Sequence, residues 1–81
     1  MRIIIAKLMY VTELKQNYAT VARNKIGYDF MLTKVIPGER AVFEQINSND
    51  SLTTSIVKEI GISEEKIIVV TENSKYRFKV I

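Results

Sequence analysis

Three cations near the end of the chain are its best candidates for binding chemistry. Lys75, Arg77 and Lys79 occupy every second position, and the residues between them are aromatic or aliphatic. A β-strand has a period of two, which places alternate residues on one face at intervals of about 7 Å. The three cations would therefore share a face and could hold the phosphates of an anionic ligand. Solvated charges that protect a strand edge are the alternative interpretation.

The segment before this strand predicts a β-hairpin over residues 66–81. Two β-rich runs flank the pair Asn73-Ser74, which is typical of a turn. A two-residue loop at this pair needs a left-handed backbone conformation, and Asn tolerates that conformation better than most residues. Asn73 and Ser74 therefore join the three cations as candidate ligand-binding residues.

The amino-acid composition excludes several kinds of catalytic group. The chain has neither cysteine nor histidine, so it has no thiol nucleophile, no redox pair and no imidazole base. The hydroxyl groups clustered over residues 51–55 lack a neighbouring base, since Lys58 would project to the opposite face of a strand from Ser55. The carboxylates show no spacing typical of a hydrolase. We therefore expect a protein that is not an enzyme.

A polar loop over residues 47–51 has oxygen side chains at the spacing that a calcium ion prefers. Counting from Asn47, however, Leu52 stands where an EF-hand loop requires Gly, and Lys58 stands where it requires a bidentate carboxylate. A plain turn explains the loop better. We expect neither a metal nor a cofactor.

The strands that must carry these residues are predicted from runs of β-branched and aromatic residues. Such runs cover residues 1–11, 28–36, 40–46 and 52–60, and Pro37-Gly38 fits the centre of a type II turn. With the hairpin, the count is six or seven strands with short turns. The sequence therefore predicts a mainly β protein, a single domain over residues 1–81 with the architecture of a small antiparallel, partly closed barrel or sandwich.

Residues 12–26 admit two interpretations. In the first they form a helix, with Thr12 as the N-cap, apolar residues at helical spacing and Gly27 just beyond the end. In the second, residues 17–23 form a strand, because Tyr, Thr and Val favour strands and every other segment favours a sheet. The strand is marginally preferred.

Part of the chain resembles small phage and prophage proteins. The residues that carry the likeness are Pro37-Gly-Glu-Arg-Ala-Val-Phe, the strand Leu-Thr-Thr-Ser-Ile-Val-Lys-Glu-Ile over 52–60, and Ile-Val-Val-Thr-Glu-Asn-Ser-Lys-Tyr over 68–76. The first is similar to the GD-x-V-V-V strand of small barrels, and the other two are similar to a TS-x-V strand followed by a T-x-N-S-x-Y hairpin. The resemblance implies a counter-defence protein in the cytoplasm of a host cell. Such a protein would block a host factor or sequester a small signalling molecule.

The expected partners follow from charge and size. A net charge of +3 favours anions by long-range steering, and the apolar runs are too short for a membrane-spanning helix. So small a domain also gains stability as a homo-oligomer. We expect a binding module for a host protein or a small, nucleotide-derived anion. A nucleic-acid-binding regulator is the alternative, although Tyr76 and Phe78 are predicted to face the core rather than lie beside the cations.

Overall fold

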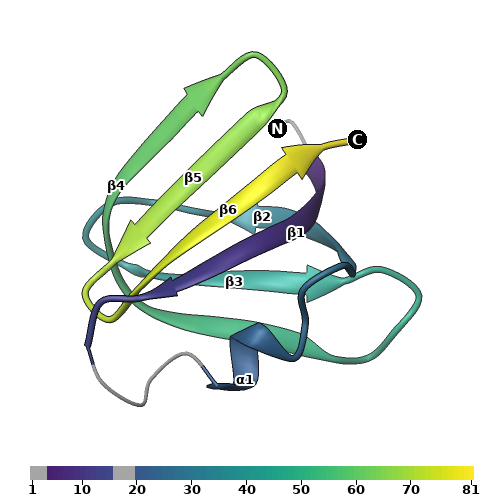
Figure 1. The fold of residues 1–81 in the computed structure, drawn as a ribbon, viewed down its shortest axis with the longest axis horizontal. Helices are drawn as coiled ribbons and strands as arrows, with labels where there is room; N and C mark the ends of the chain where they lie inside the picture. Colours follow the sequence, from purple (N-terminus) through teal and green to yellow (C-terminus); the bar gives the residue numbers. More distant parts are fainter. Residues whose placement is uncertain (1–3, 16–19) are drawn as a thin grey trace.

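Six antiparallel strands close into a ring in the computed structural model, which describes residues 4–15 and 20–81 (Figure 1). Each strand pairs with the next one in sequence, and the last strand pairs with the first. The prediction of a small, mainly β, antiparallel barrel-like protein is therefore confirmed. The elements are β1 (Ile4–Glu13), α1 (Thr20–Arg23), β2 (Asp29–Lys34), β3 (Arg40–Gln45), β4 (Ser51–Ser63), β5 (Lys66–Thr71) and β6 (Ser74–Val80).

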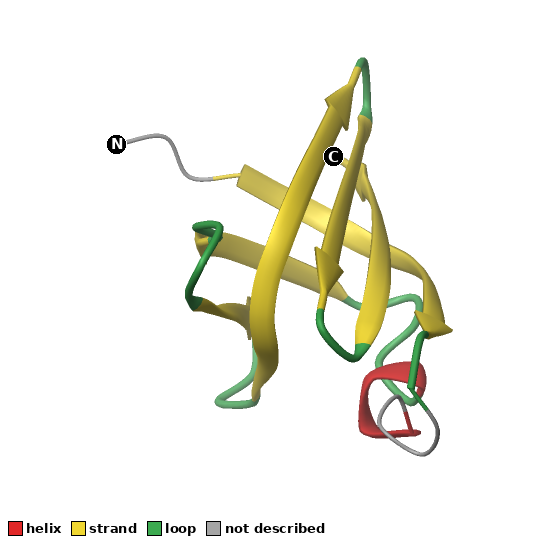
Figure 2. Ribbon diagram, turned by 90° about the vertical axis from the view of Figure 1, so that its left-hand side faces the viewer, coloured by secondary structure: helices red, strands yellow, loops and turns green. Residues whose placement is uncertain are grey.

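Two long strands, β1 and β4, each take part in two sheets. The start of β1 pairs with β2 over residues 4–7, and β1 pairs with β6 over residues 6–13. In the same way β4 pairs with β3 over residues 51–56 and with β5 over residues 57–63. Two sheets therefore cross each other and share these strands, as Figure 2 shows. One sheet carries β6 between β1 and β5.

Aromatic residues from three strands form the centre of the core. The ring of Phe43 lies 5.0 Å from that of Phe78 and 5.4 Å from that of Tyr76, both edge to face. Phe30 contacts Phe78 in the same manner, at 6.5 Å between ring centroids. Such edge-to-face contacts add about 0.5 to 1.5 kcal/mol per pair beyond the burial of apolar area. Because Tyr76 and Phe78 are held inside, their neighbours along β6 must face outward.

Neither interpretation holds for the whole of residues 12–26, although the helix is confirmed over residues 20–23, which form α1. Thr12 and Glu13 belong to β1, where they pair with Lys75 and Ser74, so Thr12 caps no helix. The only helical turn in the described part of this stretch is α1, so the predicted strand is wrong over residues 20–23. Residues 16–19, with the rest of that predicted strand, lie outside the described residues. Pairing with β6 thus overrides the helical spacing, and Leu14, which a helix would bury, is half exposed.

Turns at two glycines follow the predicted chemistry. Gly38 has a φ of 91°, and the N–H of Glu39 donates to the C=O of Ile36, which completes the type II turn expected at Pro37-Gly38. Gly27 has a φ of 96° and donates its N–H to the C=O of Leu8 at 2.8 Å.

Among the described residues no helix has the length and apolar character needed to cross a membrane.

Candidate functional site

Strand β6 presents the predicted alternation of charged and apolar residues. Arg77 and Lys79 are exposed on the outside of the ring, Lys75 is half-buried, and Tyr76 and Phe78 are buried. Because β6 lies between β1 and β5, the outward residues of these two strands flank its cations. We call this outer surface of β1, β6 and β5 the cationic face.

Three lysines form a row across the cationic face. Lys79 is the register partner of Lys7 on β1 and also of Lys66 on β5. Directly opposite residues in a sheet have Cβ atoms about 4.5 to 5.5 Å apart, and like charges at such positions destabilise the sheet. The row therefore concentrates positive charge, and the repulsion between its lysines lowers the stability of the protein when no ligand is bound.

No carboxylate of the described residues forms an ion pair with this row, although Asp29 on β2 is the register partner of Lys7 and Glu65 follows the end of β4 next to Lys66. The ion pairs in that part of the chain join Arg23 to Glu13, Lys25 to Asp50 and Lys34 to Glu39. All nine acidic residues of the sequence lie outside the ranges 1–3 and 16–19. The positive charge of Lys66, Arg77 and Lys79 is therefore left to solvent or to a ligand, whereas Lys7 has Asp29 beside it on β2.

A β-bulge at Met9 brings an aromatic ring to the cations. Leu8 pairs with Phe78 and Tyr10 pairs with Arg77, so Met9 is an extra residue in β1. The bulge turns two consecutive side chains outward, and Tyr10 is 59% exposed. Tyr10 thus lies opposite Arg77, although sequence reasoning expected no aromatic side chain beside the cations.

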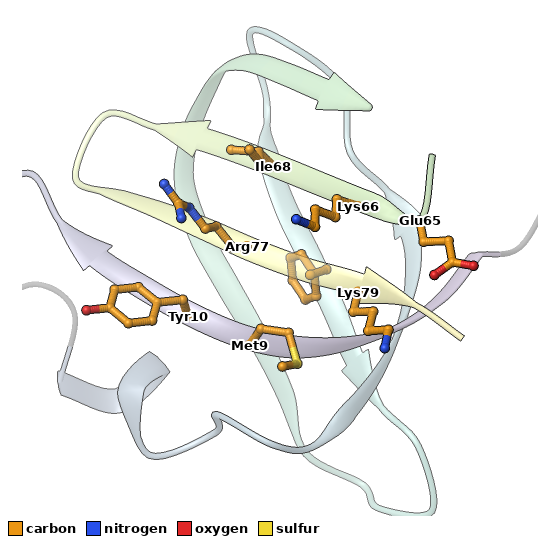
Figure 3. Close-up of a pocket in the computed structure, with 8 residues that line it drawn as sticks. Met9, Tyr10, Glu65, Lys66, Ile68, Arg77 and Lys79 are labelled. Carbon is orange, nitrogen blue, oxygen red and sulfur yellow. The ribbon is translucent and has the colours of Figure 1, made fainter. Parts of the chain in front are cut away.

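The cationic face contains an open hollow of about 710 Å³ (Figure 3). Arg77 and Tyr10 lie at one side of it, Lys66 and Lys79 lie towards the other, and Glu65 lies beyond them (Figure 3). Apolar groups complete the surface. The lining residues are Met9, Tyr10, Glu65, Lys66, Ile68, Arg77, Phe78 and Lys79.

Asn73 and Ser74 do not join the hollow, and the turn lies one residue earlier than predicted. The residues that link β5 to β6 are Glu72 and Asn73, and Asn73 is not among the residues with a positive φ. Ser74 is only 1% exposed and donates its N–H to the Thr71 hydroxyl at 3.1 Å. Ser74 therefore holds the hairpin turn, while Asn73 donates its N–H to the Ser55 hydroxyl at 3.1 Å, and of the predicted ligand-binding residues the hollow brings together only Arg77 and Lys79.

The misplaced turn explains why sequence reasoning missed Lys66. A loop at Asn73-Ser74 would put Ile68 opposite Lys79, whereas the observed loop puts Lys66 there. A shift of the turn by one position moves the register by two residues and leaves the faces unchanged. The hairpin sequence therefore predicts the Lys66–Lys79 pair, but only when the turn is placed at Glu72-Asn73.

The face offers hydrogen-bond donors and charge rather than reacting groups. Lysine ammonium and arginine guanidinium groups are donors only, which suits the acceptor oxygens of a phosphate. In the part of the chain that the structure describes, no three acidic residues gather closely enough to hold a metal ion. Inside the ring, burial raises the pKa of the Tyr76 phenol. The donors of the cationic face are therefore suited to an anion.

Comparison of the chain with models of protein families, with curated proteins and with solved structures gave no match. A proposal about function therefore depends on the charges and contacts of the cationic face.

Proposed function

We propose that this protein is a non-enzymatic binding module that holds a phosphate-bearing, nucleotide-class ligand on the cationic face. The observation that supports the proposal is the row of Lys66, Lys79 and Lys7, placed side by side and forming no ion pair among the described residues. The proposal keeps the anionic ligand expected from the sequence. It moves the site from Lys75, Asn73 and Ser74 to residues of β1 and β5.

Phosphate binding relieves the repulsion within the row. Adjacent strands lie about 4.8 Å apart, so one phosphate group can contact two neighbouring lysines of the row. In the free protein the opposed ammonium groups repel each other, whereas a bound dianion attracts each of them. A hydrogen bond to a charged group contributes about 1.5 to 3 kcal/mol, so each contact adds appreciable affinity.

The base of a nucleotide would lie against Tyr10. This ring is exposed beside Arg77, and stacking of a base on an aromatic side chain contributes about 1 to 3 kcal/mol. Met9 and Ile68 add apolar surface in the same hollow. The sequence argued against base stacking because no aromatic residue was expected beside the cations. Tyr10 supplies such a residue.

The shape of the hollow suits either of two sources of the same chemistry. A volume of about 710 Å³ lies within the range of about 300 to 1,000 Å³ that is typical of small-ligand pockets. The hollow is also open at the surface, so a single-stranded oligonucleotide could pass over it. Both ligands present phosphates to lysines and a base to an aromatic ring.

Calorimetric titration at two salt concentrations tests the proposal. The ligands are a nucleoside diphosphate, a cyclic dinucleotide and a mixed single-stranded oligonucleotide. We expect binding of at least one ligand, and a loss of that binding when Lys7, Lys66 and Lys79 are all replaced by Gln. An oligonucleotide would show a steep fall in affinity with salt, with a slope of about −0.7 per neutralised phosphate. Absence of binding to all three by the unmodified protein would contradict the proposal.

A control variant shows whether the lysine row binds the ligand or whether the net positive charge of the protein attracts it. Lys34 lies on β2, away from the cationic face, and pairs with Glu39 at 3.4 Å. Lys34→Gln should therefore leave the affinity unchanged. An equal loss in this variant would indicate attraction by net charge alone. A phage context, a host-protein target and a counter-defence role stay predictions from the sequence resemblance, and they become the leading hypothesis if no phosphate ligand binds.

A further inference from the structure

The second half of β4 has a partner strand on one side only. From Glu59 to Ser63 it pairs with β5, whereas its pairing with β3 ends at Ile56. The last contact on that side is made by Val57, which exchanges backbone hydrogen bonds with Gly38 and Glu39 at 2.8 Å. Figure 1 shows the β4–β5 hairpin extending beyond the rest of the ring. Among the described residues no backbone group pairs with the open side of β4 beyond this point.

The geometry of the hairpin decides which backbone groups face the open side. The residues that flank its two-residue turn are Ser63 and Lys66, and in such a hairpin these residues exchange hydrogen bonds. Hydrogen-bonded and non-hydrogen-bonded pairs then alternate along the strand. Gly61 consequently bonds towards β5, while the N–H and C=O groups of Ile60 and Ile62 point to the open side.

Apolar side chains lie beside this free edge. Ile60, Ile62 and Ile67 line a hollow of about 200 Å³ together with Ile4, Leu32 and Val35 from the opposite side of the ring opening. Ile62 is 71% exposed, which makes it the most exposed large apolar side chain of the described residues. A free edge next to an apolar surface is the arrangement that recruits another strand.

We infer that the free edge of β4 binds a second copy of this chain, as an antiparallel β4–β4 pair with Gly61 at the two-fold axis. This register places Ile60 of each copy opposite Ile62 of the other. Both residues have their backbone groups pointing outward, so they can exchange the missing hydrogen bonds. The two Ile60–Ile62 pairs also cover the apolar hollow of each copy.

Two further features of β4 fit a second copy of the same strand. Lys58 of one copy lies towards the β4–β5 turn of the other, which carries Glu64 and Glu65, so opposite charges meet at both ends of the pair. At the centre Gly61 faces Gly61 in a non-hydrogen-bonded pair, where the backbones approach most closely. A strand whose sequence is complementary to itself when reversed fits the isologous contact of a two-fold dimer.

Cysteine cross-linking tests the register in a chain that has no cysteine of its own. A side chain at Gly61 has room, because an added Cβ meets only the Ile68 Cβ at 3.9 Å. Across a non-hydrogen-bonded pair the Cα atoms are about 4.5 Å apart, within the range that a disulfide spans. Gly61→Cys should therefore convert fully to a disulfide dimer under mild oxidation. Ser63→Cys is the matched control, since Ser63 would face Glu59, and it should form little disulfide-linked dimer.

Sedimentation of the unoxidised protein tests the dimer itself. We expect a concentration-dependent dimer that Ile62→Lys abolishes, because the new ammonium group would face the apolar hollow of the other copy. The control is Ile81→Lys, which alters an isoleucine of similar exposure, 69%, away from this edge and should leave the dimer intact. A monomer at every concentration, a dimer insensitive to Ile62→Lys, or equal cross-linking of both cysteine variants would overturn the inference. None of these measurements depends on ligand binding at the cationic face.

Discussion

Tyr10 and Arg77 face each other on the outside of the ring because β1 contains one residue more than β6 along their shared ladder. If β1 were regular, with Met9 paired to Arg77, strict alternation would turn Tyr10 towards the core, where Tyr76 already lies against Phe43. The bulge thus releases an aromatic ring to the surface without disturbing the packed rings inside. Bulges commonly re-aim side chains in this way beside binding sites.

The first prediction concerns this ring. Tyr10→Ala should change the free energy of unfolding by no more than about 0.5 kcal/mol, because the side chain is largely exposed. The same variant should lose about 1 to 3 kcal/mol of affinity for the nucleotide ligand, the value of one stacked base. Tyr28→Ala is the control, since Tyr28 is similarly exposed but lies outside the hollow. Equal affinities of the two variants in calorimetry would remove Tyr10 from the site.

The second prediction concerns the effect of the lysine row on the stability of the protein. Lys79→Gln should raise the free energy of unfolding by about 0.2 to 1 kcal/mol at low salt, because it removes two like-charge neighbours. The gain should shrink at high salt, where the charges are screened. Lys34→Gln should instead lower the stability by up to about 1 kcal/mol, because it breaks an ion pair with Glu39. Urea denaturation at two salt concentrations measures both, and a loss of stability in Lys79→Gln would contradict the interpretation.

The third prediction concerns the hydroxyl group that holds the β5–β6 turn. The buried Thr71 hydroxyl accepts the N–H of Ser74 at 3.1 Å and donates to the C=O of Ser74 at 3.0 Å. Thr71→Val keeps the shape but leaves these buried groups without a partner, at a cost of about 1 to 3 kcal/mol. Thr53→Val, an exposed change on β4, should cost less than about 0.5 kcal/mol. Similar denaturation midpoints for the two variants would show that the hydroxyl does not hold the turn.

The fourth prediction compares Asn47 and Asn73, which lie in two different turns. Asn47 has a φ of 59°, in the left-handed region, whereas Asn73 is not among the residues with a positive φ. A β-branched residue is strained at such a position, so Asn47→Val should cost about 1 to 2 kcal/mol of unfolding free energy. Asn73→Val should cost clearly less. Thermal unfolding of both variants checks the order, whereas the sequence analysis expected the left-handed conformation at Asn73.

The fifth prediction follows from the buried phenol. Burial raises the pKa of Tyr76 above its ordinary value of 10.0, so the folded protein disfavours the phenolate. The unfolded chain loses its proton first as the pH rises. The stabilising contribution is therefore complete below about pH 10 and is lost as the pH approaches the raised pKa of the folded state. Tyr76→Phe should lose less stability than the unmodified protein between pH 9 and pH 11, and parallel stability curves would contradict this.

Local patterns in the sequence determined which residues form strands and which side of β6 faces outward. Alternation at residues 75–80 is a period-two signal that needs only the adjacent residues, and the structure confirms it. The Pro37-Gly38 turn was equally local, because a glycine after proline suits the positive φ of a type II turn. In the same way the absence of histidine and cysteine excluded whole classes of chemistry before any fold was known.

Only the tertiary structure decided which cations meet and what lies beside them. The row of Lys7, Lys66 and Lys79 joins residues more than seventy positions apart, through strand pairings whose register no single segment specifies. The end of β1 is a strand rather than a helix because Thr12 and Glu13 pair with β6, and the outward Tyr10 depends on a bulge that exists only relative to that partner. Pairing between distant strands is a property of the closed ring, so the site became visible only when the ring was assembled.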